Sequence, residues 1–177
     1  LGDLCADAYR AMSGADVAFV NGGGIRKDIA AGDITYGDII AVHPFGNMLC
    51  VVEATGQEIL DALELSASKL PAEYGGFLHV SGLRYTIDLQ VPSSVKLDEN
   101  GLFVSVDGER RVKDVMVGDA PLDPAKTYTV SSHNYLLRNG GDGYTMFMDN
   151  PLLQDSVMID NQVLINYIVD VLGGTVG

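Results

Sequence analysis

Basic residues are scarce in this sequence. Only 11 Lys and Arg stand against 24 Asp and Glu among 177 residues, which gives a net charge of −13. This balance argues against general binding to nucleic acid or to an anionic membrane, because both require clustered Lys and Arg. An anionic ligand would need a locally placed Arg, and Arg26, in a glycine-rich corner, is the candidate. We interpret the pair Arg110-Arg111 as the solvated edge of a hairpin.

Long apolar runs and closely spaced cysteines are also missing. No run approaches the roughly 20 apolar residues that a membrane helix needs, so we expect no membrane span in this chain. Cys5 and Cys50 stand apart among apolar neighbours, which favours buried free thiols and leaves a disulfide open. The chain opens at Leu1 without a methionine or a leader pattern, so we expect a mature or excised part of a longer protein.

The common catalytic and metal-binding motifs are absent from the sequence. The glycine run 22–24 lacks the Gly-Lys-Ser/Thr of a phosphate-binding loop and the spacing of a dinucleotide fingerprint. There is no GxSxG nucleophile motif. His43, His79 and His133 show no metal-ligand spacing, and such isolated histidines are more often structural than catalytic. The sequence therefore predicts no catalytic residue and no metal ligand in this chain, and indicates a binding pocket more clearly than a catalytic centre.

The pattern of helices and strands predicts one α+β domain. We expect helices over 1–12, from a capping box at Thr35 to about Val42, from a second capping box at Thr55, and from a cap at Asp160 to Gly173. We expect Asp107-Gly108 to turn a tight hairpin between two short strands. The expected strands cover 16–20, 47–54, 83–89, 101–106, 112–117 and 128–132.

Two glycine-rich corners follow strand-like runs. Residues 134–144 combine two tyrosines, three glycines and Asp142, and residues 21–26 combine Asn21, three glycines and Arg26. Glycine allows tight turns with positive φ, so Asp142 can be held in a fixed direction. An aromatic face beside a fixed carboxylate suits a ring that stacks and carries hydroxyls or amines. The alternative is an ordinary turn with Tyr135 and Tyr144 in the core, but two such corners favour two sides of one pocket.

Eight short motifs occur in an order that resembles the C-terminal domain of the 5′-nucleotidase family, which includes UDP-sugar hydrolases, 2′,3′-cyclic phosphodiesterases and ecto-5′-nucleotidase. The resemblance covers nearly the whole chain, and its two glycine corners are the most specific part. The motifs are GDL (2–4), DA (7–8), NGGGIR (21–26), GDIT (32–35), YGD (36–38), PFG (44–46), LHVSG (78–82) and YLLRNGGDG (135–143).

The resemblance implies a division of labour between two domains. Residues 1–177 would form a single substrate-binding domain, a layered α-β-β-α structure with mixed sheets. A metallophosphoesterase domain, absent from this chain, would precede it and carry two divalent metal ions and a catalytic His–Asp pair. The family also uses an Arg upstream of the first motif, which lies outside this chain.

The resemblance also implies roles for particular residues. Phe45 and Tyr135 would clamp the base, and Tyr135 keeps a ring where the family commonly has Phe. Asp142 would take ribose hydroxyls, and Arg26 would reach toward the ribose or phosphate. The full set of expected substrate-binding residues is Asn21, Gly23, Arg26, Phe45, Tyr135 and Asp142.

These expectations together describe the nucleoside- or nucleotide-binding half of a secreted, cell-surface or periplasmic phosphohydrolase. The chain alone is expected to be inactive, because the dimetal centre would lie in the other half. One alternative is a non-catalytic interaction module that keeps the fold without the ligand. A self-contained small-molecule enzyme is disfavoured by the missing nucleophile and metal sets.

Overall fold

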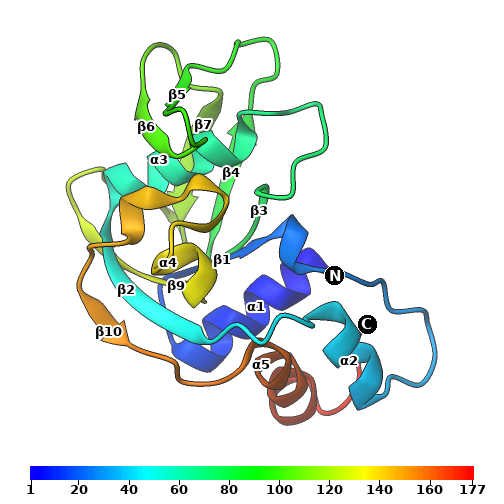
Figure 1. Ribbon diagram of the computed structural model, residues 1–177. Coiled ribbons are helices and arrows are strands. Elements are labelled where there is room, and N and C mark those ends of the chain that lie inside the picture. The colour runs from blue at the N-terminus through cyan, green and yellow to red at the C-terminus, as the bar shows by residue number, and fades with distance from the viewer.

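A five-stranded mixed sheet forms the centre of the computed structural model, which describes residues 1–177 (Figure 1). The strand order is β10-β2-β9-β1-β3. β1 and β9 run parallel, and the other neighbouring pairs are antiparallel. The strands are β1 (Val17–Asn21), β2 (Leu49–Thr55), β3 (Leu78–Ser81), β9 (Thr127–His133) and β10 (Leu152–Gln154).

Three helices cover one face of this sheet: α1 (Gly2–Ser13), α2 (Tyr36–Val42) and α5 (Asp160–Asn166), which continues into a π-helical segment, η4 (Tyr167–Val171). The end of α1 and the start of α2 follow local chemistry. Gly14 ends α1 in the left-handed conformation, and Thr35 with Asp38 closes the expected capping box of α2. Tyr9, Val20, Leu49 and Leu164 are among the side chains buried between the helices and the sheet.

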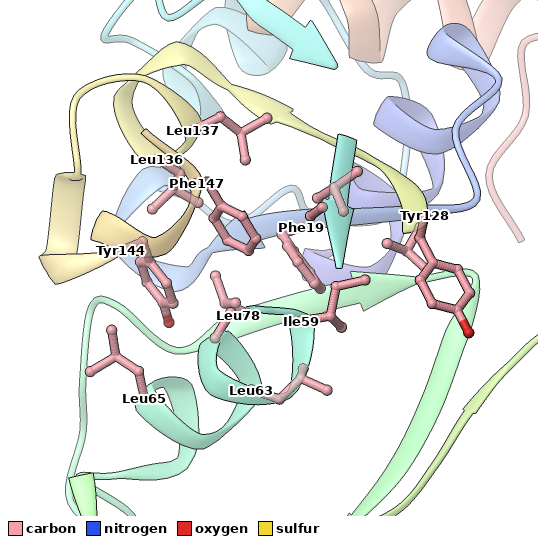
Figure 2. Close-up of a cluster of buried hydrophobic side chains, with 14 of the residues drawn as sticks. Phe19, Ile59, Leu63, Leu65, Leu78, Tyr128, Leu136, Leu137, Tyr144 and Phe147 are labelled. Atoms are coloured by element: carbon pink, nitrogen blue, oxygen red, sulfur yellow. The ribbon is translucent and has the colours of Figure 1, made fainter. Parts of the chain in front are cut away.

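The opposite face carries α3 (Gly56–Ala67) and two small antiparallel sheets. The first contains β4 (Leu83–Ile87), β7 (Val112–Val117) and β8 (Ala120–Pro121), and the second contains β5 (Val95–Leu97) and β6 (Phe103–Val106). Figure 2 shows this core, in which Phe19 of the central sheet meets Phe147, with ring centroids 6.2 Å apart, and Ile59 and Leu63 approach from α3. The predicted α+β architecture with mixed sheets is therefore confirmed.

The expected hairpin at Asp107-Gly108 is wrong. β6 pairs with β5, whereas β7 pairs with β4 and β8. Residues after β6 are drawn toward the β5 side, because the Asp107 amide donates to the Ser94 carbonyl at 2.8 Å and the Ser94 hydroxyl donates to the Glu109 carbonyl at 2.7 Å. The segment 107–111 thus crosses between two sheets. Strands β3, β5, β8 and β10, which are short, were not assigned from the sequence.

The solvated edge expected at Arg110-Arg111 is also wrong, because Arg111 is buried. Its guanidinium donates to the carbonyls of Ala67 and Leu70 at 3.1 and 2.9 Å, and to Val91 at 2.6 Å. The first two carbonyls lie at the C-terminus of α3 and just beyond it, where backbone acceptors lack helical partners and a cation is favoured. Arg110 forms an ion pair with Asp61 of the same helix.

The helix cap expected at Asp160 is wrong. Asp160 does not cap the last helix: the N-cap position is Ile159, and the buried Asp160 carboxylate instead accepts from the Asn47 amide at 3.2 Å and the Asn161 amide at 2.8 Å. Cys5 and Cys50 are both buried and free, so the disulfide that the sequence left open is not formed. Burial raises the pKa of the Cys5 thiol to about 12, which keeps it protonated at neutral pH.

Candidate functional site

Three segments meet at one edge of the central sheet. β1 ends at Asn21 and continues into a 3-10 turn, η1 (Gly22–Gly24), while its parallel neighbour β9 ends at His133 and continues into α4 (Asn134–Leu137) and a second 3-10 turn, η2 (Gly141–Gly143). The carboxyl ends of parallel strands lie at the same edge, so the two glycine corners are neighbours. β2 starts at this edge as well, because Leu49 pairs with His133, and it brings the loop 44–48.

A cleft of about 360 Å³ opens where these segments meet. Phe45 and Tyr135 offer the cleft partly exposed aromatic rings, with 60% and 38% of their surface accessible. The structure thus brings together five of the six residues expected from the sequence. The lining consists of Asn21, Gly23, Gly24, Phe45, Asn47, Tyr135 and Asp142.

Arg26 is the expected residue that does not line the cleft. Its guanidinium carbon lies 5.8 Å from the centroid of the Phe45 ring, and its Nη1 donates to the Gly23 carbonyl at 3.3 Å. A guanidinium at this distance over an aromatic face is attracted by the ring. Arg26 therefore supports Phe45 at the rim, and its charge stays next to the opening because the side chain is exposed.

The Asp142 carboxylate is fixed by two side chains in the cleft. Its Oδ1 accepts from the Tyr135 hydroxyl at 2.9 Å, and its Oδ2 accepts from Asn21 Nδ2 at 2.6 Å. Its backbone carbonyl accepts from the Tyr74 hydroxyl at 2.9 Å, and its backbone has the left-handed φ of 52°. Two effects raise the pKa of Tyr135: partial burial, which is the larger, and the hydrogen bond to Asp142. The Tyr135 hydroxyl therefore stays protonated and acts as a donor. A carboxylate held this way keeps free lone pairs that point in defined directions.

Two of the glycines are required by close packing. A Cβ on Gly141 would lie 2.4 Å from the Tyr135 ring, and a Cβ on Gly24 would lie 2.7 Å from Asn21 Oδ1. Any larger residue would displace the ring or the amide that lines the cleft. Both glycines therefore shape the cleft by leaving room for the Tyr135 ring and the Asn21 amide that line it.

Asn47 and Gly24 are lining residues that the sequence analysis missed. Asn47 directly follows the Pro-Phe-Gly stretch in the sequence, and its position next to Phe45 and Gly46 could have indicated that it lines the cleft. Hydrogen bonds hold the end of its loop next to β2: the Asn47 amide donates to Asp160, and Asn134 exchanges two hydrogen bonds with Met48 at 2.8 and 2.9 Å. The exposed Phe45 therefore lies two residues before the fixed end of the loop.

Two buried histidines lie beneath the cleft. One ring nitrogen of His43, Nδ1, is 3.2 Å from the Gly24 carbonyl, and Nε2 of His133 is 3.0 Å from Asn21 Oδ1. Burial lowers the pKa of both rings, and the neighbouring His43 helps to bring the pKa of His133 to about 4. Both histidines are therefore neutral at neutral pH and serve as hydrogen-bonding groups for residues of the cleft.

No group of three or more His, Cys, Asp or Glu side chains is arranged to hold a metal ion, and the cleft contains only one carboxylate. A larger hollow of about 760 Å³ between α2 and the C-terminal segment is lined by twelve residues, of which seven are hydrophobic and none is an expected site residue. None of the helices is long and apolar enough to span a membrane.

The chain folds into an α+β domain with a mixed central sheet, and its cleft of about 360 Å³ is formed in part by the two glycine corners. Comparison with known proteins identifies its class: the family model for the 5′-nucleotidase C-terminal domain matches residues 1–149. The chain is 35% identical over 170 residues both to a 5′-nucleotidase of Vibrio cholerae and to protein UshA of Escherichia coli K12. It is also 35% identical to the crystal structure of a 5′-nucleotidase precursor from Thermus thermophilus, with a TM-score of 0.80.

The chain therefore belongs to the 5′-nucleotidase family and corresponds to its C-terminal domain. The matches include 95% of this chain but only 26% of the two curated relatives, and 96% of this chain but 32% of the Thermus protein. The chain thus spans about a quarter of the length of the curated relatives it matches.

Proposed function

We propose that this chain binds the nucleoside part of a nucleotide and confers specificity on a 5′-nucleotidase-type phosphohydrolase. The observation that supports this most directly is the cleft itself, where two exposed aromatic rings and one fixed carboxylate line a volume of about 360 Å³. That volume lies at the small end of the range typical of ligand pockets.

In this proposal the two chemistries of the cleft recognise different parts of the ligand. Phe45 and Tyr135 stack on the base, which buries apolar surface and tolerates different bases because every base has a π face. The Asp142 carboxylate accepts a hydrogen bond from a ribose hydroxyl. Arg26, at the rim beside Phe45, attracts the phosphate by its positive charge.

Hydrolysis itself is assigned to residues outside this chain. We propose that a preceding metallophosphoesterase domain carries two divalent metal ions, that this chain alone is inactive, and that the whole protein is secreted, cell-surface or periplasmic. The relatives are consistent with a further domain, because this chain covers only 26% of their length. The residues of this chain bind and orient the nucleoside.

Calorimetric titration of adenosine, adenine and AMP tests the proposal. Wild type should bind adenosine with micromolar to millimolar affinity, since the cost of ordering the ligand offsets much of the stacking energy. Replacing Tyr135→Ala should weaken adenosine and adenine alike by about 1–3 kcal/mol. The matched control is Tyr36→Ala, which removes an exposed tyrosine of α2 outside the cleft. This variant should bind all three ligands with the affinity of wild type. If wild type binds none of these ligands at millimolar concentration, the proposal is wrong and an interaction module is favoured.

A further inference from the structure

His133 is connected to the cleft without lining it. The side chain is 1% exposed at the end of β9, and its Nε2 lies 3.0 Å from Asn21 Oδ1. The other end of the same amide, Asn21 Nδ2, lies 2.6 Å from Asp142 Oδ2. A continuous chain of hydrogen bonds therefore leads from the buried ring through Asn21 to the carboxylate.

The carboxylate end of this chain determines how the Asn21 amide is oriented. An ionised carboxylate only accepts hydrogen bonds, so the amide group at 2.6 Å from Asp142 Oδ2 must be the NH₂ and not the carbonyl. The amide carbonyl then faces His133 and also accepts only. The proton between the two residues must consequently sit on Nε2 of His133.

The opposite end of the ring independently gives the same tautomer. Nδ1 of His133 lies 3.4 Å from the backbone amide of Leu136, which can only donate, so Nδ1 carries no proton. Burial and the nearby His43 ring keep His133 neutral at neutral pH by lowering its pKa to about 4. A neutral ring with an accepting Nδ1 carries its proton on Nε2.

The surroundings of the ring keep it in place. Tyr9 of α1 meets the His133 ring edge to face with centroids 6.2 Å apart, and the Tyr135 ring lies 5.9 Å away on the cleft side. Asn21 is itself buried, with 4% of its surface accessible, so water has little access to take over the histidine's hydrogen bond.

We propose that His133 is a positioning residue: its Nε2–H holds the Asn21 amide in the one orientation that aims Nδ2 at Asp142, and thereby fixes the carboxylate that recognises the ribose. The link from His133 to Asp142 stands on geometry alone, and only its effect on ribosides rests on the proposed function.

Two replacements separate the hydrogen bond from the structural role of the ring. His133→Asn keeps an acceptor near the Nδ1 position for the Leu136 amide but removes the Nε2 donor. His133→Gln places an amide donor near the Nε2 position and should restore the link to Asn21. His79→Asn is the matched control, because His79 lies in β3, outside the cleft lining.

The first measurement needs no ligand and uses NMR spectra of the 177-residue chain. Long-range ¹H–¹⁵N correlation should show the Nε2–H tautomer of His133 in wild type. The side-chain amide signal of Asn21, assigned by its loss in Asn21→Ala, should shift in His133→Asn and return toward wild type in His133→Gln. An Nδ1–H tautomer in wild type, or an Asn21 signal unchanged in a folded His133→Asn, would overturn the inference even if one of the variants fails to fold.

The second measurement is calorimetric binding of adenosine and adenine. His133→Asn should weaken adenosine by about 2- to 10-fold, the range for one hydrogen bond, and leave adenine within about twofold. Combining His133→Asn with Asp142→Asn should cause no further loss beyond Asp142→Asn alone, because both act through one carboxylate. Equal weakening of both ligands, or additive losses, would mean a merely structural role and refute the inference. Absence of binding by wild type, with the NMR results as expected, refutes the proposed function and leaves the positioning of Asp142 standing.

Discussion

Asp142 is the residue on which recognition of a ribose would depend. It adopts a left-handed backbone conformation with φ of 52° while its two carboxylate oxygens accept from Tyr135 and Asn21. Asn tolerates this backbone conformation as well as Asp does. The replacement Asp142→Asn therefore removes the charge without disturbing the turn.

We expect Asp142→Asn to weaken adenosine by about 1.5–3 kcal/mol, the contribution of a hydrogen bond to a charged group, and to leave adenine nearly unchanged. Calorimetric titration of both ligands against the variant and wild type measures this difference. If the variant binds adenosine as tightly as wild type, Asp142 is only a turn residue.

The hydroxyl of Tyr135 also helps to fix the Asp142 carboxylate. A hydroxyl that only faced water would make Tyr135→Phe silent, but the hydroxyl donates to Asp142 Oδ1 at 2.9 Å and accepts from the Asp142 amide at 3.3 Å. Because Phe keeps the stacking face and loses this constraint, adenosine binding should change by about 0.5–1.5 kcal/mol while adenine binding stays constant. An adenosine affinity equal to that of wild type would show that Asn21 alone holds the carboxylate.

At the scale of elements, α3 is held at both ends by side chains. Thr55 and Glu58 form the capping box at its start. The buried Arg111 guanidinium donates hydrogen bonds to backbone carbonyls at its end. The Arg111 amide and its neighbour, the Val112 amide, both donate to the buried Glu64 carboxylate of the same helix. These contacts tie β7 to α3 and bury one face of each.

Replacing Arg111→Lys should lower the free energy of unfolding by about 1–3 kcal/mol, because an ammonium lacks the planar fork that reaches several carbonyls at once. Urea denaturation followed by circular dichroism measures the change. Arg84→Lys is the control, since Arg84 is an exposed residue of β4 with one hydrogen bond to a carbonyl, and it should stay within about 0.5 kcal/mol of wild type. Equal stability of Arg111→Lys and wild type would mean that the buried contacts contribute nothing net.

At the scale of the whole molecule, the two buried histidines make stability depend on pH. The pKa of His133 is about 4 in the folded chain and 6.5 ordinarily, so the unfolded chain binds a proton that the folded chain does not between these values. The free energy of unfolding is then highest above pH 6.5 and falls as the pH drops toward about 4. His43 acts in the same direction because burial lowers its pKa, whereas burial raises the pKa of Asp160, which opposes the loss at the acidic end.

We expect His133 alone to account for roughly 3 kcal/mol of this loss, at about 1.36 kcal/mol for each unit of pKa. Thermal or urea unfolding at several values of pH between about 7 and 4 measures it, and His133→Asn should show a flatter profile than wild type. A profile that is equally steep in this variant would assign the effect to other groups, with His43 and Asp160 the first to be tested.

Local chemistry explains which parts of the fold could be predicted. The helix starts at Thr35 and Thr55 were predicted correctly because each depends on residues within a few positions of it. The hairpin at Asp107-Gly108 was wrong because the same turn residues also suit a crossing segment, and the choice depends on which strand lies alongside. Arg111 was misplaced for the same reason, since its partners lie 41 and 44 positions away.

The sequence by itself determined the α+β class, the family and the chemical identity of the two glycine corners, because motifs, caps and turns are encoded in contiguous residues. Only the tertiary structure decided that Arg26 stands behind Phe45, that Asn47 and Gly24 line the cleft, and that a buried histidine lies behind the carboxylate. The Asn21–Asp142 hydrogen bond joins residues 121 positions apart. Such a contact exists because β1 and β9 are parallel neighbours whose ends share one sheet edge, and no local pattern in the chain specifies that pairing.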